Sequence, residues 1–118
     1  MTTTRMYDSA RLQFVDTEDE GIIAYMLDVF VRLIPPAAED MRKAYEAQDL
    51  DRVRALARRI KPSIFELDIQ PLKDTIVNIE AEASAGQKTP SLGAQIEKLC
   101  GVIMEVKGQM LEEIAARK

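Results

Sequence analysis

Histidine is absent from this sequence of 118 residues, and cysteine occurs once, as Cys100. Zinc sites in proteins are built mainly from cysteine and histidine, so we expect no metal site. A Ser-His or Cys-His nucleophile pair has no histidine to use, and the sequence holds no glycine-rich phosphate loop. These absences predict a protein without a metal, a cofactor or an enzymatic activity.

A lone cysteine also cannot form a disulfide within the chain. The N-terminal residues MTTTRMYDSARLQFVD lack the uninterrupted apolar run of a signal peptide, so we expect a reducing, cytoplasmic environment. The most apolar segment, GIIAYMLDVFVRLIPPAA, contains Asp28 and Arg32 and ends at two prolines. It falls short of the roughly 20 clean apolar residues of a spanning helix, so no membrane association is expected.

Basic residues do not dominate the charge. There are 16 lysines and arginines against 20 acidic residues, for a net charge of -4, so the surface as a whole does not attract nucleic acid. The basic segment 52–61 also has no interleaved aromatic residue, which disfavours a single-strand binding groove. The composition, 47% apolar and 31% charged, is typical of a soluble globular protein, and the length fits one domain over residues 1–118.

Apolar residues recur with helical spacing along most of the chain. A first helix is expected after an N-cap at Asp16 or Thr17, and its two adjoining stripes predict a wide buried face. The stripes are Ile22, Met26, Val29 and Leu33, and beside them Ile23, Leu27, Phe30 and Ile34. Pro35 and Pro36 must break or bend this helix before the pattern resumes with Ala37, Met41, Ala44 and Tyr45.

Three further helices follow from the same spacing. Asp49 is expected to cap the second, and Gly86 to end the third. Their inner residues are Val53, Ala57, Ile60, Ile64 and Leu67, then Leu72, Ile76, Ile79 and Ala83, and after the linker GQKTPS, Leu92, Ile96, Leu99, Ile103, Val106, Met110 and Ile114. Such helices can bury their stripes only against each other, which predicts an all-α, up-and-down four-helix bundle. Residues 1–15, with Met6, Leu12 and Phe14, are expected to form a short N-terminal capping segment.

Several polar residues have ordinary structural interpretations. Cys100 lies beside the apolar stripe of the last helix, so it is expected to serve as a small, buried apolar residue. Glu80 and Glu82 cannot face each other on one helix and are expected on a solvated face. The acidic residues from Asp16 to Glu20 lack the glycine and the distal glutamate of an EF-hand, so they are interpreted as the first turn of a helix.

The segment from Ala57 to Ser63 reads A-R-R-I-K-P-S, and Leu67, Leu72 and a later E-x-x-A-x-x-G at 80–86 follow it. This order resembles the histidine-containing phosphotransfer (HPt) domain, whose central helix carries A-H-x-L-K-G-S-S. The upstream residues 25–30 and the spacing from Ala44 to Asp49 are similar to the family as well. The resemblance covers nearly the whole chain. It implies a four-helix bundle from two-component phosphorelay signalling.

The chain departs from the family at the site of phosphotransfer. Arg58 occupies the position of the phosphorylated histidine, Pro62 replaces a glycine, Ile64 replaces the second serine, and Asp68-Ile69 replaces a glycine-alanine pair. Arginine stays protonated near neutral pH and is a poor nucleophile, so Arg58 is not expected to relay phosphate. Pro62 is expected to kink the helix, although an early helix end at Pro62 is an alternative.

Arg54, Arg58 and Lys61 follow i, i+4, i+7 spacing and share one helix face, which Arg52 and Arg59 flank. In HPt domains this face docks against a receiver domain with a carboxylate-lined pocket. The resemblance therefore predicts a module that binds a receiver through Arg54, Arg58, Arg59, Lys61 and Ser63 without carrying phosphate. The alternative is a structural bundle that has lost docking and self-associates through Tyr25 and Val31, so a monomer or a weak homodimer is expected.

Overall fold

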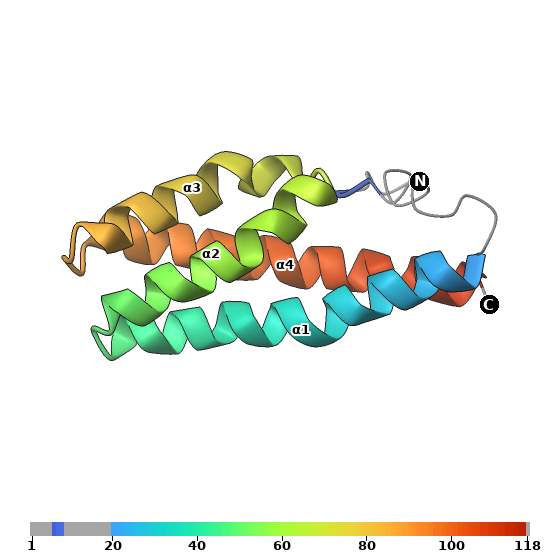
Figure 1. Ribbon diagram of the computed structural model, residues 1–118, viewed down its shortest axis with the longest axis horizontal. Helices are drawn as coiled ribbons and strands as arrows, with labels where there is room; N and C mark the ends of the chain where they lie inside the picture. Colours follow the sequence, from blue (N-terminus) through green and yellow to red (C-terminus); the bar gives the residue numbers. More distant parts are fainter. Residues whose placement is uncertain (1–5, 9–19, 118) are drawn as a thin grey trace.

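Four α-helices make up the part of the chain that the structure describes, residues 6–8 and 20–117 of a computed structural model. They are α1 (Glu20–Glu46), α2 (Leu50–Glu66), α3 (Gln70–Ser84) and α4 (Pro90–Arg117). Short turns join them, so consecutive helices run antiparallel (Figure 1). The predicted all-α, up-and-down four-helix bundle is confirmed.

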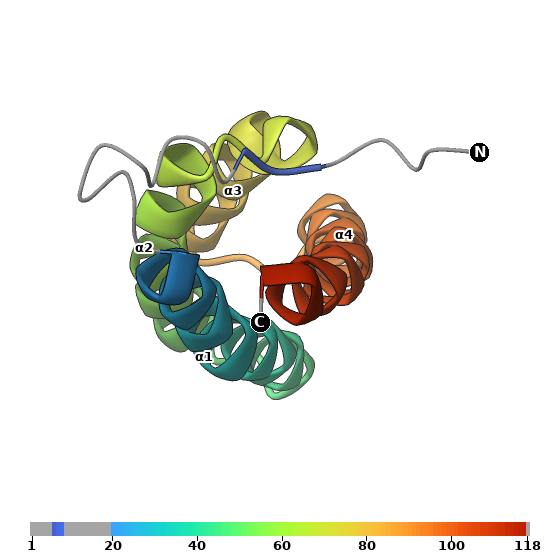
Figure 2. The same ribbon diagram turned by 90° about the vertical axis from the view of Figure 1, so that its right-hand side faces the viewer.

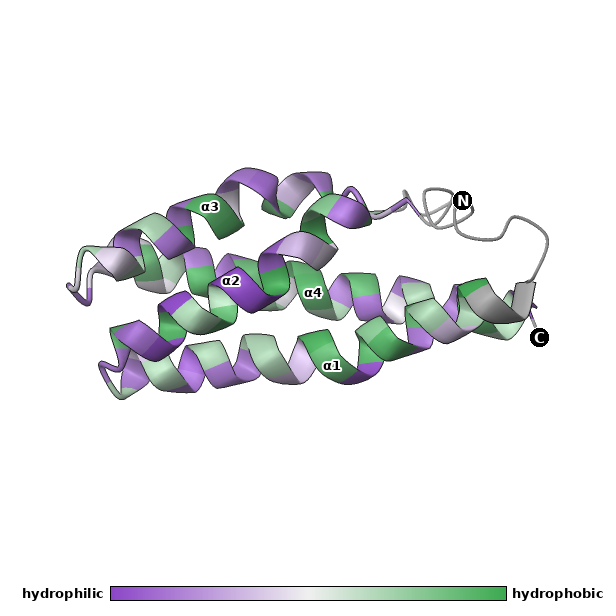
Figure 3. Ribbon diagram, in the orientation of Figure 1, coloured by the Kyte–Doolittle hydropathy of each residue, from purple (hydrophilic) through white to green (hydrophobic). Residues whose placement is uncertain are grey.

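The helices surround a common centre in the order α1, α2, α3, α4 (Figure 2). Each helix packs against the one before it and the one after it, and α4 closes the ring by packing against α1. Hydrophobic residues recur along all four helices with hydrophilic residues between them (Figure 3). No helix in the described ranges combines the length and the apolarity that a membrane span requires.

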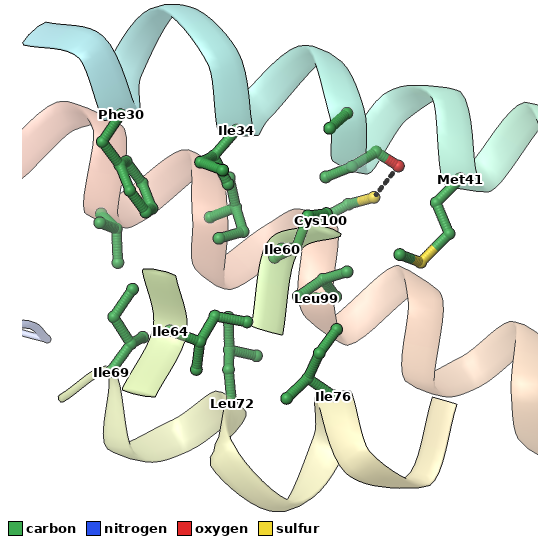
Figure 4. Packing of buried hydrophobic residues seen from close by; sticks show 14 of the residues in the cluster. Phe30, Ile34, Met41, Ile60, Ile64, Ile69, Leu72, Ile76, Leu99 and Cys100 are labelled. Carbon is green, nitrogen blue, oxygen red and sulfur yellow. Dashed lines mark hydrogen bonds between the residues drawn. The ribbon is translucent and has the colours of Figure 1, made fainter. Parts of the chain in front are cut away.

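The centre of the bundle is filled by aliphatic side chains from every helix (Figure 4). Ile34 and Met41 of α1, Ile60 of α2, Ile76 of α3 and Leu99 of α4 are all buried. The predicted inner stripes of α2, α3 and α4 are buried as expected. Burial of one such side chain contributes about 1.5–3 kcal/mol, so the core holds the four helices together.

Proline does not interrupt α1. Pro35 and Pro36 lie inside a continuous helix, and the ribbon bends in its middle (Figure 1). A proline inside a helix lacks the N–H that would bond to the carbonyl four residues earlier, which explains a bend. Of the two predicted outcomes, the bend is therefore the one observed. The expected caps Asp16 and Thr17 lie outside the described residues.

Only one of the two apolar stripes predicted on α1 is buried. Ile23, Leu27, Phe30 and Ile34 lie in the core, whereas the side chain of Leu33 is 62% exposed. Met26 and Val29 are half-buried, and Ile22 lies outside the described side chains. The wide buried face was therefore a wrong prediction. The reason is the inclination of α2, which runs from the C-terminal end of α1 toward α3 and leaves the N-terminal half of α1 partly uncovered (Figure 1).

Helix α2 continues through Pro62 and ends at Glu66, so the alternative of an early end at Pro62 is wrong. Asp49 caps its start as predicted, because its side chain accepts a hydrogen bond from the backbone N–H of Arg52 at 3.2 Å. Past Pro62, Ile64 and Leu67 remain buried. Their burial stabilises the last turn despite the hydrogen bond that the proline ring removes.

The turn from α2 to α3 depends on a left-handed residue, Asp68, whose φ is 52°. The N–H of Asp68 donates to the carbonyl of Phe65 at 3.2 Å, and the N–H of Ile69 donates to the carbonyl of Ile64 at 2.9 Å. This pair of bonds is the Schellman motif. Glycine favours this backbone conformation and aspartate tolerates it. The resemblance to HPt domains places a glycine at this same position.

Helix α3 ends before Gly86 as predicted, and α4 begins at Pro90 rather than at Leu92. Thr89 caps α4, because its hydroxyl oxygen accepts a hydrogen bond from the N–H of Leu92 at 3.1 Å. Proline at the first helical position follows the usual preference at this place.

The described N-terminal residues close one end of the bundle. Tyr7 is buried, and its hydroxyl donates to Glu113 at 2.6 Å. The N–H of Met6 donates to Gln109 at 2.9 Å, and the N–H of Asp8 donates to the carbonyl of Leu67 at 2.7 Å. These bonds connect the turn after α2 to α4. The capping segment predicted over residues 1–15 is observed for residues 6–8, and Leu12 and Phe14 lie outside the described residues.

Candidate partner-binding face

Two of the predicted site residues meet a carboxylate of the neighbouring helix. Nζ of Lys61 lies 2.7 Å from Oε2 of Glu80, and Nε of Arg58 lies 3.7 Å from Oε1 of the same residue. Arg54, one turn before Arg58, is exposed and makes no ion pair with any described residue. The structure thus places Arg54, Arg58 and Lys61 on the side of α2 that adjoins α3.

Glu80 is more enclosed than the cations that it holds. Its side chain is 23% exposed, whereas that of Arg58 is 67% exposed. A solvated face was therefore a wrong prediction for Glu80, because the carboxylate lies between α2 and α3. It was wrong for Glu82 as well, which is half-buried and accepts hydrogen bonds from Gln95 and Ser91 of α4.

Phe65 extends this face by one further turn and was not singled out from the sequence. Its side chain is large, apolar and partly exposed, and Nζ of Lys73 lies 5.8 Å from the centre of its ring. Lys73 also forms an ion pair with Asp68. The spacing of Lys61 and Phe65, i and i+4, was visible in the sequence. We name the set Arg54, Arg58, Lys61, Phe65 and Glu80 the α2–α3 face.

Arg59 and Ser63 lie on a different side of α2. Ser63 lines a groove of about 130 Å³ between α1 and α2, and Arg59 is one helical turn before it on the same side. The residues lining this α1–α2 groove are Met26, Val29, Phe30, Leu33, Ile34, Ser63, Glu66 and Leu67. The five residues predicted to bind a partner therefore do not form a single patch.

The predicted self-association surface is also divided. Tyr25 is 64% exposed on α1, close in sequence to the groove residue Met26. Val31 is buried, so its predicted exposure is wrong. Val31 lies on the side of α1 that packs into the bundle.

Cys100 has the buried role predicted from its position. Its thiol donates to the carbonyl of Ala38 at 3.4 Å (Figure 4). Burial raises the pKa of the Cys100 thiol, although the nearby Arg42 guanidinium acts in the opposite direction. The pKa of Arg42 is raised, mainly by Cys100 and further by Glu39 and Glu97. A buried thiol with a raised pKa is a poor nucleophile, so Cys100 serves packing.

The chemistry available on the α2–α3 face is ionic and apolar. Arginine and lysine side chains there can donate hydrogen bonds to carboxylates. Among residues 6–8 and 20–117, no three Cys, Asp or Glu side chains are grouped so that they would hold a metal ion. The face thus offers cationic hydrogen-bond donors, two of which pair with Glu80, and one exposed aromatic ring.

Comparisons of the chain with protein-family models, curated proteins and solved structures find no significant match. The resemblance to HPt domains accordingly rests on the residues quoted above, and the structure by itself shows a four-helix all-α domain.

Proposed function

We propose that this protein is an HPt-like module that binds receiver domains of two-component signalling without itself carrying phosphate. The observation that supports this most is the exposed cation Arg58 in the place of the phosphorylated histidine, next to Lys61 on the α2–α3 face. A receiver presents a carboxylate-lined pocket, and an arginine can donate two parallel hydrogen bonds to a carboxylate.

Glu80 has a defined part in this proposal. In the free protein Glu80 pairs with Arg58 and Lys61, the two cations that are proposed to bind a carboxylate of the receiver. Receiver binding must then replace or share these ion pairs. Arg54, without an ion pair among the described residues, steers the acidic partner from the rim, and Phe65 supplies the apolar contact beside the charges.

The direct test is a calorimetric titration of the protein against receiver domains from its own source. Arg58→Glu should weaken binding by about tenfold or more, because it places a negative charge against the acidic pocket. Glu80→Gln should strengthen binding severalfold, because it releases the two cations and remains able to accept a hydrogen bond. Lys98→Glu, at an exposed position of α4, is the matched control and should leave affinity unchanged.

Two results would contradict the proposal. One is that no receiver binds the wild-type protein. The other is that Arg58→Glu binds as tightly as wild type, or loses no more affinity than Lys98→Glu.

Phosphotransfer itself should be absent. Incubation with a phosphorylated receiver is expected to leave no acid-labile label, because no imidazole is present to accept it. Arg58→His alone should restore little transfer, since Pro62 still alters the helix and Ile64, at the place of the family's second serine, is fully buried. Robust labelling of that variant would show that the proline and the isoleucine matter less than argued.

A further inference from the structure

The partly uncovered side of α1 and the α1–α2 groove form an apolar surface that the α2–α3 face does not include. Tyr25 and Leu33 are the two most exposed large apolar residues of the described chain, at 64% and 62%. Both belong to α1, and Met26 and Val29 lie between them in sequence and line the groove. Exposed apolar groups gathered around a groove are typical of a protein interaction site.

Charged side chains at the edge of this surface indicate which kind of partner the surface fits. Arg59, Ser63 and Glu66 follow i, i+4, i+7 spacing along the groove side of α2. Arg59 and Glu66 are exposed, and neither makes an ion pair with a described residue. One cation and one anion, neither of them in an ion pair with a described residue, therefore border the groove and are separated along the helix axis by about 10 Å.

A surface with this layout is complementary to itself. In a symmetric dimer the same patch faces its own copy, so residue i contacts residue j and residue j contacts residue i. If two copies of α2 cross antiparallel at Ser63, Arg59 lies opposite Glu66 of the partner subunit, and Glu66 lies opposite Arg59 of the partner subunit. Ser63, at the centre, is small enough to permit close approach. In this arrangement Leu33 and Tyr25 of each subunit are covered by the other subunit.

We propose that the protein forms a symmetric homodimer through the α1–α2 groove, held by Leu33 and Tyr25 and by reciprocal Arg59–Glu66 ion pairs. The dimer does not rest on receiver binding. It leaves the α2–α3 face open, because Arg58 and Lys61 lie on the other side of α2.

Sedimentation equilibrium over a range of protein concentrations tests the dimer. The wild-type mass should rise from 13.3 kDa toward twice that value. Leu33→Asp should weaken association by tenfold or more and leave the melting temperature of the monomer nearly unchanged, because Leu33 is exposed. Met104→Asp, at a residue 56% exposed on α4, is the matched control and should not affect association.

A charge exchange tests the pairing. Arg59→Glu and Glu66→Arg each place two like-charge contacts across the symmetry axis and should each weaken the dimer by about tenfold. The double variant Arg59→Glu/Glu66→Arg recreates both opposite-charge contacts and should recover most of the wild-type affinity. A different protein seated on this groove would carry the original charges, so the double variant would not recover its binding.

Three outcomes overturn the proposal. The first is a wild-type protein that remains a monomer at about 1 mM, where even weak complexes are populated. The second is a dimer that Leu33→Asp weakens no more than Met104→Asp does. The third is a double charge variant that associates no better than the two single variants.

Discussion

Gly93 of α4 lies against the ring of Tyr45 at the end of α1. A Cβ atom added at Gly93 would lie 2.6 Å from Oη and 2.8 Å from Cζ of Tyr45, distances that van der Waals repulsion does not allow. Gly93→Ala must therefore displace the ring. The Tyr45 hydroxyl donates to the carbonyl of Thr89 at 2.7 Å, so the displacement also affects the residue that caps α4.

The expected cost follows from three opposing contributions. Loss of the Tyr45 hydrogen bond costs about 1 kcal/mol. Overpacking at a contact of this kind costs about 1–3 kcal/mol. Alanine returns about 1 kcal/mol through its better helix propensity. Gly93→Ala should therefore lower the free energy of unfolding by about 2 kcal/mol.

Gly101 of the same helix provides the matched control. No heavy atom lies within 4 Å of a Cβ added there, so Gly101→Ala keeps only the propensity gain and should stabilise the protein by about 0.5–1 kcal/mol. Urea denaturation followed by circular dichroism measures both changes. The two substitutions are chemically identical, so their opposite signs would isolate the contact with Tyr45.

The same substitution in a Tyr45→Ala background decides whether the ring is the cause. Without the ring, Gly93→Ala should become stabilising, as Gly101→Ala is in the wild-type protein. If Gly93→Ala destabilises the Tyr45→Ala protein as much as it destabilises wild type, the steric reasoning is refuted.

Pro62→Ala should stabilise the protein by about 1 kcal/mol, because alanine restores a backbone N–H donor for the Arg58 carbonyl, and it should also change the affinity for a receiver. An unchanged melting temperature would contradict the first expectation, and an unchanged affinity would contradict the second. Burial raises the Cys100 pKa, so the folded state favours the thiol, and this stability is lost as pH rises through the raised pKa. Wild type should therefore lose more stability than Cys100→Ala as pH rises above the ordinary thiol pKa of about 8.5, measured in urea. Tyr7→Phe should cost about 1 kcal/mol by removing the bond to Glu113; an unaltered unfolding midpoint would contradict it.

The helices themselves follow from local sequence. Apolar spacing placed the core stripes of α2, α3 and α4, and Asp49 and Gly86 marked two boundaries where the structure has them. These features were predictable because helical periodicity and capping act within a few residues of the chain. The start of α4 was missed by a short distance, although Thr89 followed by Pro90 is a recognisable cap.

The continuity of the proline-containing helices was not decided locally. A proline costs about 3 kcal/mol in a helix interior, which left open whether Pro62 would end α2. Burial of Ile64 and Leu67 against the rest of the bundle offsets this cost. Only the tertiary packing supplies that compensation.

The candidate site was likewise predictable from the sequence only in part. Helical spacing alone grouped Arg54, Arg58 and Lys61 on one side of α2, and the structure keeps them together. Helical spacing did not show that Glu80 pairs with two of these cations, because that contact depends on how α3 lies beside α2.

The sequence by itself thus determined four amphipathic helices, their order and most of the core, because these depend on residues a few positions apart. The tertiary structure decided which of the two apolar stripes of α1 is covered, where Glu80 points, and that the side of α2 that carries Arg59 and Ser63 adjoins the groove with α1. Those outcomes depend on the inclination of α2 between α1 and α3 (Figure 1). That inclination arises from packing among residues distant in sequence, which no local pattern encodes.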